Sequence, residues 1–199
     1  MKVLLVEDQR LIMSALAILL DLEPDIEVVA SASGGQQAQQ LIAEHLPDIV
    51  ISDIEMPDGD GLSLAEWLTA SGLGCKMLIL TTFAKPGYLQ RALNAGVHGY
   101  LLKDTPAEQL AEKLRLMMQG AQVIDPSLTR SAMRFESPLS ARELRLLALV
   151  ATGLSAKQAA DQLHIAHGTA RNLLSEIMGK LQVSSRQAAV IRAQELGLL

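Results

Sequence analysis

The most constraining feature of this sequence is an unbroken apolar run, Ile49-Val50-Ile51, which ends two residues later on the carboxylate of Asp53. Met56-Pro57 and the turn residues Asp58-Gly59-Asp60-Gly61 follow directly. Apolar runs without polar alternation are typical of strands that are buried on both faces of a parallel α/β sheet. Ligands bind just outside the carboxyl ends of the strands in such sheets, which places Asp53 where chemistry usually occurs. A lone carboxylate at a strand end is more often simply solvated, so the interpretation depends on its neighbours.

The composition limits the class of protein. A chain of 199 residues, 49% of them hydrophobic, is long enough for one large domain or two small ones. No apolar run reaches the length of a membrane span, and the N-terminus lacks the basic-then-apolar pattern of a signal peptide. The single Cys75 cannot form an internal disulfide, which fits a reducing compartment. We therefore expect a cytoplasmic protein without membrane contact.

The charge is unevenly distributed along the chain. Residues 1–129 carry 8 Lys and Arg against 17 Asp and Glu, whereas residues 138–199 carry 7 against 4. The first part is therefore acidic, with a net charge of −9, and the last part is basic, with a net charge of +3. An acidic half joined to a basic half suggests two functions, and nucleic acid is a candidate partner for the second.

The first 120 residues alternate between two patterns. Five apolar segments read as strands and five amphipathic segments read as helices, which predicts a doubly wound α/β domain with a five-stranded parallel sheet. The strands are expected at 2–6, 26–30, 49–51, 76–80 and 98–102, and the helices at 10–20, 36–44, 61–70, 86–95 and 106–118.

Four of these strands end on polar residues, and the ends of parallel strands share one edge of the sheet. The residues are Glu7, Asp8, Asp53, Thr81 and Lys103. Carboxylates that converge repel one another unless a cation neutralises them, and oxygen ligands of this kind suit Mg²⁺. A carboxylate nucleophile with a metal ion, a lysine and a hydroxyl suits the transfer of a phosphoryl group.

These residues also carry a resemblance to a known family. The motifs that match are Glu7-Asp8, Asp53-x-x-Met56-Pro57-x-x-x-Gly61, Thr81, Tyr100 and Lys103-Asp104. Together they resemble the receiver domain of bacterial two-component response regulators, which implies a flavodoxin-like fold over residues 1–120. The resemblance implies that Asp53 accepts a phosphoryl group from a sensor histidine kinase and that Thr81 and Lys103 contact that group.

The same resemblance implies a metal site and a switch. Asp8, Asp53 and the main-chain carbonyl of Glu55 would bind Mg²⁺ directly, and Glu7 would hold it through water. Tyr100 would rotate inward as Thr81 moves. In such a protein the receiver assists its own phosphorylation and dephosphorylation and is not otherwise an enzyme.

The rest of the chain has a different pattern. Residues 121–137 read as a linker with at most one short helix. From residue 138 onward four helices are expected, at 144–152, 156–163, 170–181 and 185–196, and Ser140 with Glu143 forms the sequence signature of a capping box. The second and third of these helices are spaced as in a helix-turn-helix, although a small four-helix bundle for protein contacts fits the spacing equally well.

Particular residues favour the helix-turn-helix. The motifs are Leu139-Ser140-x-Arg142-Glu143, Gly153-Leu154-Ser155-x-Lys157-Gln158-x-Ala160, Leu163-His164-Ile165, Thr169-x-Arg171-Asn172 and Lys180-Leu181-x-Val183-x-x-Arg186. They resemble the LuxR-type DNA-binding domain, and the whole chain then resembles a response regulator of the NarL/FixJ type. Ala170 and Leu173 depart from the family pattern, which often has Val and His there, so the operator preference of relatives does not transfer.

The hydrogen-bonding groups in the grooves of DNA suggest roles for residues of the second and third helices. Arg171, Asn172 and Ser175 are the residue types and spacing that reach base edges in the major groove. The phosphate contacts that position the domain are expected from Ser155, Lys157, Thr169 and Lys180. Because a net charge of +3 is low for DNA binding, we expect two copies to bind promoter DNA as a homodimer after phosphorylation.

Two other functions fit part of the pattern. A phosphatase with an aspartate nucleophile needs a second carboxylate two residues later, where Glu55 stands. A regulator that works without phosphorylation would use the acidic edge only to bind metal. The segment 80–104 also resembles the branch of the family that regulates a fatty-acid desaturase in bacilli, which suggests a role in membrane-lipid control.

Overall fold

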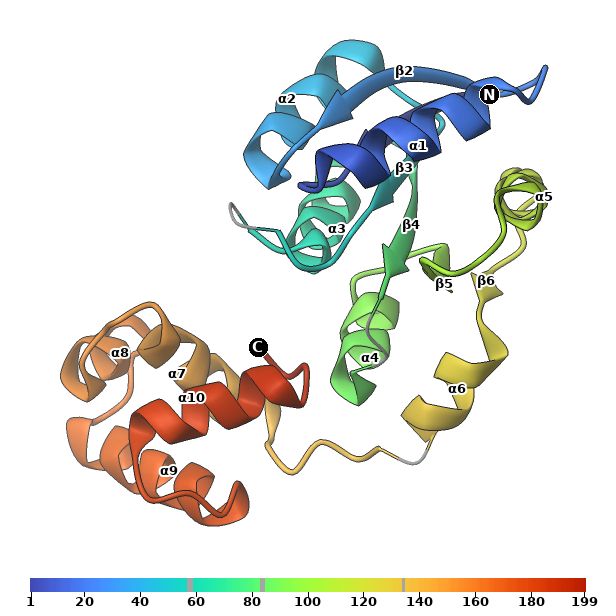
Figure 1. Ribbon diagram of the computed structural model, residues 1–199. Coiled ribbons are helices and arrows are strands. Elements are labelled where there is room, and N and C mark those ends of the chain that lie inside the picture. The colour runs from blue at the N-terminus through green and yellow to red at the C-terminus, as the bar shows by residue number, and fades with distance from the viewer. Residues whose placement is uncertain (57–58, 83–84, 134) are drawn as a thin grey trace. The chain divides into compact units, whose positions relative to one another are not determined.

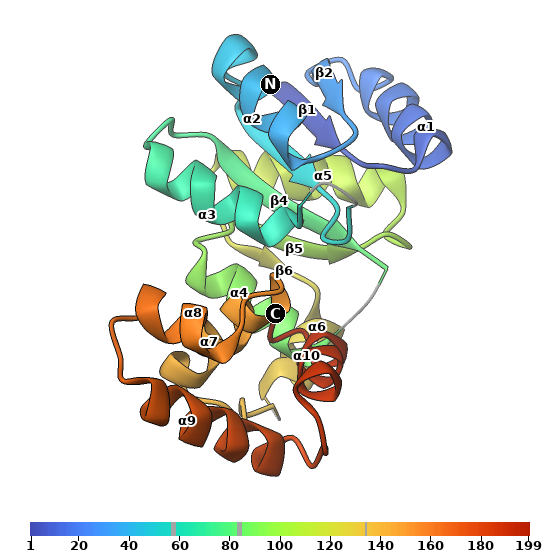
Figure 2. The same ribbon diagram turned by 90° about the vertical axis from the view of Figure 1, so that its left-hand side faces the viewer.

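The computed structural model describes residues 1–199 except 57–58, 83–84 and 134, and it leaves out the side chains of 86 and 130–133 (Figures 1 and 2). Pro57 and Asp58 of the turn after Asp53, and part of segment 80–104, lie outside the described residues. The chain divides into two compact units, Met1–Ala84 with Leu89–Ser131 and Lys85–Tyr88 with Ala132–Leu199. Among the described residues, no helix combines the length and the apolar composition that crossing a lipid bilayer requires.

The first unit is an α/β domain built on one parallel sheet. Its strands are β1 (Lys2–Val6), β2 (Glu27–Ala32), β3 (Ile49–Ser52), β4 (Lys76–Thr81), β5 (Gly99–Leu102) and β6 (Val123–Ile124), in the order β2-β1-β3-β4-β5-β6. The helices between them are α1 (Arg10–Asp21), α2 (Gly35–His45), α3 (Gly61–Ser71), α4 (Pro86–Asn94) and α5 (Ala107–Met118), and α6 (Pro126–Met133) follows β6. The reversal of strand order beside β1 is the switch point of a doubly wound fold, as predicted.

The sheet has a sixth strand that the sequence pattern did not reveal. Val123 and Ile124 pair in parallel with Gly99 and Tyr100 of β5. Both residues fall in the predicted linker, because a two-residue strand is too short to show any periodicity. The short helix allowed for in that segment is α6.

Helices cover both faces of the sheet, and each face has its own apolar layer. On one face, residues of alternate strand positions such as Val3, Ile51 and Leu78 pack with Leu110 and Leu114 of α5 and with α1. On the other face α2 and α3 lie side by side (Figure 2). All four residues of β3 are buried, in agreement with the unbroken apolar run that predicted a strand covered on both faces.

The second unit contains four helices around one apolar core. They are α7 (Ala141–Ala151), α8 (Ala156–Gln162), α9 (His167–Lys180) and α10 (Arg186–Glu195). The predicted capping box begins α7, where Glu143 N–H donates to Ser140 Oγ over 3.4 Å and Ser140 N–H donates to Glu143 Oε2 over 2.7 Å. Ser155 and Gln158 form a second capping box at the start of α8. Ala170 and Ile177 of α9 are fully buried in the core.

A partly buried ion pair joins α9 to α7. Lys180 Nζ lies 2.8 Å from Oε2 of Glu143, whose side chain is only 2% exposed. Burial by itself raises the pKa of the Glu143 carboxyl, but hydrogen bonds from Lys180 and Ser140 outweigh burial and hold the pKa below its usual range. The ionised form of Glu143 is therefore stabilised by folding.

One prediction concerns Gly61, the first residue of α3. A Cβ atom there would lie 2.0 Å from the carbonyl oxygen of Asp53 and 2.8 Å from Ser52 Oγ. Because the nearer obstacle is backbone, Gly61→Ala is expected to lower the free energy of unfolding of the α/β domain by about 1–3 kcal/mol, as overpacking does. Urea denaturation measures the change. The exposed Glu66 of the same helix serves as control, since Glu66→Ala should change stability by no more than about 0.5 kcal/mol.

A second prediction concerns pH. Because the pKa of Glu143 is depressed in the folded state, its contribution to stability is complete above the usual glutamate pKa of about 4.3 and is lost as pH falls through the lower folded value. Glu143→Gln should destabilise the helical domain by about 1–3 kcal/mol at pH 7 and flatten this acid-side dependence. Chemical denaturation between pH 3 and pH 7 tests both effects. The same acid-side slope in Glu143→Gln and in wild type would contradict the assignment; exposed Glu195→Gln is the control.

Candidate functional site

The predicted acidic residues meet at one edge of the sheet. β1 and β3 are neighbours, and the N–H of Asp53 donates to the carbonyl oxygen of Val6 over 3.0 Å, which aligns the two strand ends. Glu7, Asp8 and Asp53 therefore offer carboxylate oxygens that all lie within 4.8 Å of one another. Glu7 and Asp53 are 3% and 6% exposed, so water screens their repulsion weakly.

The geometry of this cluster suits a divalent cation. Asp8 Oδ1 is buried and has no hydrogen-bond partner among the described residues. A buried carboxylate oxygen without a donor is costly unless a cation approaches it. Three carboxylates within reach of one point supply the hard oxygen ligands that Mg²⁺ prefers, while leaving room for waters. The residues therefore fit the predicted metal.

Lys103 supplies positive charge to the same edge. Its Nζ lies 2.6 Å from Glu7 Oε2 and 2.7 Å from Asp53 Oδ2, and its side chain is 7% exposed. Burial alone would lower the pKa of this ammonium, but hydrogen bonds to Asp53 and Glu7 outweigh burial and raise the pKa above its usual value. Lys103 is therefore held as a cation between two carboxylates.

The pKa of Glu7 is also raised, which for a carboxyl favours the neutral form. Burial raises the pKa of its carboxyl, and the negative charge of Asp53 adds to that effect. The hydrogen bonds from Lys103 and from the Gln9 N–H, the latter 3.1 Å from Glu7 Oε1, reduce the rise without cancelling it. An added cation would oppose this rise and favour the ionised form of Glu7.

Three further predicted residues lie on β4, on β5 and just after β3. Thr81 is 1% exposed at the end of β4, and its carbonyl accepts a 2.9 Å hydrogen bond from the N–H of Lys103. Tyr100, on β5, is 0% exposed, so its side chain lies inside the domain. Glu55 is exposed, two residues beyond Asp53. The structure thus brings Thr81 to the acidic edge.

Two contacts at the start of α3 were not predicted from the sequence. Gly61 allows the start of α3 to lie against the Asp53 carbonyl, and Arg91 Nη2 of α4 lies 3.2 Å from Oδ2 of Asp60, the residue that caps α3. The glycine was visible in the motif but its contact was not. No local spacing links residues 60 and 91, so the ion pair had no sequence signal.

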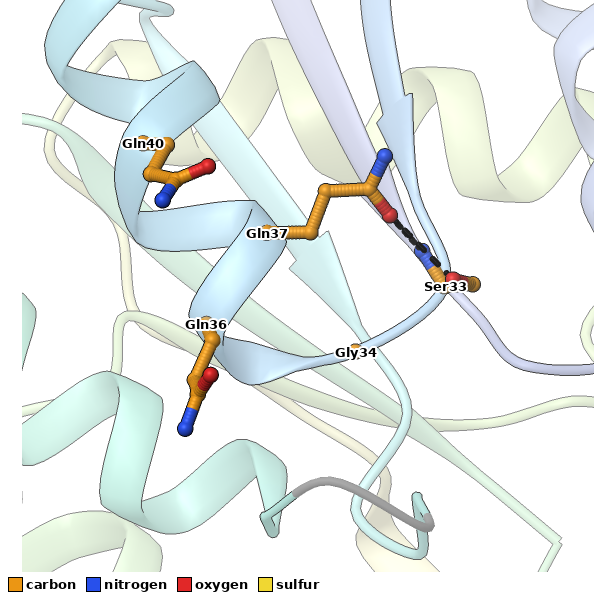
Figure 3. Close-up of a pocket in the computed structure, with 5 residues that line it drawn as sticks. All are labelled: Ser33, Gly34, Gln36, Gln37 and Gln40. Carbon is orange, nitrogen blue, oxygen red and sulfur yellow. Dashed lines mark hydrogen bonds between the residues drawn. The ribbon is translucent and has the colours of Figure 1, made fainter.

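A pocket separate from the acidic cluster lies at the start of α2 (Figure 3). It measures about 260 Å³ and is lined by Ser33, Gly34, Gln36, Gln37 and Gln40. Gln37 Oε1 accepts hydrogen bonds from the N–H and the hydroxyl of Ser33 over 2.9 and 3.1 Å. Its lining contains no ionisable group, so it offers neither a nucleophile nor a charged ligand.

In the second unit, the residues predicted to read bases lie on one face of α9. Arg171, Asn172 and Ser175 are exposed, whereas Ala170 and Leu174 are buried. The helix is therefore amphipathic in the sense needed to present these side chains outward. Ser175 also donates its hydroxyl hydrogen to the carbonyl of Arg171 over 3.1 Å.

The residues predicted to contact phosphates differ in their surroundings. Ser155 and Lys157 are exposed at the start of α8, and the Ser155 hydroxyl donates to Gln158 Oε1 over 2.7 Å. Thr169 is half-buried in the first turn of α9. Lys180 is ion-paired with Glu143, although its side chain is 43% exposed. Lys157 therefore has the most freedom of the four to reach a phosphate.

Comparison with known proteins agrees with this geometry. Residues 3–115 match the family described as the response regulator receiver domain, and residues 137–193 match the family described as bacterial regulatory proteins of the luxR family. The first match spans the strand ends that carry Asp53 and Lys103. The second spans α8 and α9.

Relatives that match over almost the whole chain are transcriptional regulators. The transcriptional regulatory protein DesR of Bacillus subtilis (strain 168) is 46% identical over 195 residues, which are 98% of this chain and 97% of that protein. The uncharacterized transcriptional regulatory protein YvfU of the same strain is 44% identical and matches 98% of each chain. The crystal structure of the response regulator ChrA from a heme-sensing two-component system is 35% identical, with a TM-score of 0.59, and covers 100% of this chain and 98% of that one.

The fold, the local geometry and the similarity to known proteins thus support both the predicted receiver domain and the predicted DNA-binding domain. This chain belongs to the family of two-component response regulators, as a transcriptional regulator that joins a receiver domain to a LuxR-type DNA-binding domain.

Proposed function

We propose that Asp53 is the phospho-acceptor of this regulator and that a sensor histidine kinase is the donor. The observation that carries the proposal is the position of the Lys103 ammonium, 2.7 Å from Asp53 Oδ2 in a buried cluster of carboxylates. A carboxylate oxygen of Asp53 attacks the phosphorus of the phosphohistidine, the P–N bond breaks, and an acyl phosphate forms. The histidine nitrogen leaves with the electron pair of the broken bond.

The proposed ligands of Mg²⁺ are Asp8, Asp53 and the carbonyl oxygen of Glu55, with Glu7 acting through water. When bound, Mg²⁺ offsets negative charge on the oxygens of the phosphoryl group. The orphaned Oδ1 of Asp8 supports its role as a ligand. Glu7, whose carboxyl has a raised pKa, is ionised more readily when a cation is near.

Lys103 and Thr81 are the proposed contacts of the attached phosphoryl group. Lys103 already donates to Asp53, so its ammonium can pair with an oxygen of the new group. The hydroxyl of Thr81 is a donor at the same edge of the sheet. We assign Tyr100 to the switch because its buried ring lies on β5, beside the strand that ends on Thr81.

Phosphorylation is proposed to produce a homodimer through α1. Three large apolar side chains lie at helical spacing and are solvated: Leu11 and Ile18 of α1 and Leu22, its C-cap, are 83%, 65% and 74% exposed. Side chains that are four and seven residues apart lie on one face of a helix, and an exposed apolar stripe marks a surface for protein contacts. The other candidate surface, formed by α4, β5 and α5, exposes its large apolar side chains less: Leu93, Leu116 and Met118 are 36%, 41% and 40% exposed.

The dimer would then bind promoter DNA in the cytoplasm with α9 in the major groove. Arg171, Asn172 and Ser175 are the proposed base contacts. The proposed phosphate contacts come from Ser155, Lys157, Thr169 and Lys180. Of these, Lys180 has a second task, because it also neutralises the buried Glu143.

The first test of this function measures whether a phosphoryl group becomes covalently attached to the protein. After incubation with acetyl phosphate and Mg²⁺, intact mass spectrometry should show the gain of one phosphoryl group, and this gain should be absent in Asp53→Asn or when EDTA removes the metal. Asp104→Asn, which alters an exposed carboxylate next to Lys103, is the matched control and should still be phosphorylated. A wild-type protein that gains no mass would exclude the phosphorylation switch. Rapid turnover of many small phosphoesters would instead favour a phosphatase.

The second test concerns the dimer face. Ile18→Asp places a charge in the α1 stripe and should keep the phosphorylated protein monomeric in size-exclusion chromatography with light scattering, without reducing its phosphorylation. Leu93→Asp places the same charge on α4 and should leave the dimer intact. The opposite pair of results would move the dimer face to α4, β5 and α5.

A further inference from the structure

Three of the four acidic side chains of the DNA-binding domain have a close side-chain partner, and one does not. Residues 138–199 contain four acidic side chains. Glu143 lies 2.8 Å from Lys180, Asp161 lies 2.8 Å from His167 and Glu195 lies 2.9 Å from Arg192. The fourth, Glu176, has no ion pair or hydrogen bond with any side chain that the structure describes.

Glu176 lies on the part of α9 that is proposed to read DNA. It is exposed, as are Arg171, Asn172 and Ser175, while Leu174 and Ile177 on either side of it are buried. Glu176 is four residues after Asn172, so the two side chains share one face of the helix. Any DNA that Asn172 contacts is therefore within reach of Glu176.

An unpaired carboxylate on this face is unfavourable unless it has a specific partner. DNA phosphates repel it, and the domain has a net charge of only +3 with which to attract them. An ionised carboxylate can only accept hydrogen bonds, so its partner in the groove must be a donor. In the major groove the amino groups of the bases are the donors, and the N4 amino group of cytosine is the usual partner of Glu.

Ser175 is the weaker acceptor for this role. Its hydroxyl hydrogen is donated to the carbonyl oxygen of Arg171 within the helix, and the neutral oxygen that remains accepts hydrogen bonds less strongly than the ionised carboxylate of Glu176. Arg171 and Asn172 recognise guanine and adenine respectively. Among the exposed base-facing side chains, Glu176 is therefore the strongest acceptor for a cytosine amino group.

We infer that Glu176 determines specificity by accepting a hydrogen bond from a cytosine amino group in each half-site, next to the bases read by Arg171 and Asn172. This inference rests on the proposed docking of α9 in the major groove. It predicts a C·G pair at one fixed position of the operator half-site, and it makes Glu176 a discriminator, since a wrong base at that position leaves its charge unpaired and close to phosphates.

The test is selection of binding sites from a random duplex pool by the full-length protein, both untreated and treated with acetyl phosphate and Mg²⁺. Wild type should enrich half-sites with a fixed C·G pair. Glu176→Ala should lose about 5- to 100-fold of the discrimination at that position alone, and Glu176→Gln should shift the preference there toward A·T, because an amide pairs with adenine. Glu195→Gln, which alters an exposed carboxylate of α10, is the control and should enrich the wild-type sequence.

The outcomes separate this inference from the docking on which it rests. If the Glu176 variants enrich the wild-type sequence at every position, and differ only in a uniformly higher affinity, Glu176 merely repels phosphates and the inference is wrong. If Arg171→Ala also leaves the sequence unchanged, α9 does not read the groove and the docking is wrong as well. A wild-type protein that enriches no sequence in either state would overturn both. Circular dichroism melting verifies that the variants are folded.

Discussion

The receiver domain depends on one electrostatic arrangement, the Lys103 ammonium held between Glu7 and Asp53. Parallel pairing brings the ends of β1 and β3 together, and the carboxylates that follow them cannot avoid one another. Because they are buried, their repulsion is strong, and without a cation the sheet edge would be unstable or its carboxyls protonated. β5 lies two strands away from β3, so only a long cationic side chain at its end can reach across β4 to both acids. Among the described residues Asp8 Oδ1 has no hydrogen-bond donor, and the proposed Mg²⁺ would supply its missing partner.

The strand ends could be predicted from the sequence because the information is local. An apolar run fixes the strand, the residue after it stands at the edge, and parallel order brings the edges together; Glu7, Asp8, Asp53, Thr81 and Lys103 all follow from these steps. The capping box at Ser140 was equally local. The ion pairs Glu143–Lys180 and Asp60–Arg91 were not predictable, because each joins residues that are 37 or 31 positions apart and no spacing rule links them. β6 was not predicted, because a strand of two residues is too short to show hydrophobic periodicity.

The two domains use their carboxylates in different ways. The receiver gathers three acids at one point, where they gain from a shared cation. The DNA-binding domain separates its four acidic side chains and gives three of them a partner each, and the pair of Glu143 with Lys180 joins α7 to α9. This pairing also draws Lys180 partly away from DNA, so a lysine whose place in a sequence motif suggests a phosphate contact acts first within the fold. In a domain with so few surplus cations, Glu176 on the outer face of α9 therefore has a large effect on which DNA is accepted.

The energetics of the proposed switch follow from the buried position of Lys103. A phosphoryl group on Asp53 would add a charge of about −1.5 to −2 at an edge that already holds three carboxylates. Lys103 would then exchange its short hydrogen bonds to Glu7 and Asp53 for contacts with the new oxygens, so the stabilising cation would itself be redistributed. Moving a two-state equilibrium from 1:99 to 99:1 requires about 5.5 kcal/mol of differential stabilisation. The new charge at a buried edge would supply part of this free energy. Burial of the α1 stripe in a dimer would supply a further part, because Leu11, Ile18 and Leu22 leave water only in the dimer. Phosphorylation and dimerisation are in this way reciprocal, since each must favour the state that the other requires.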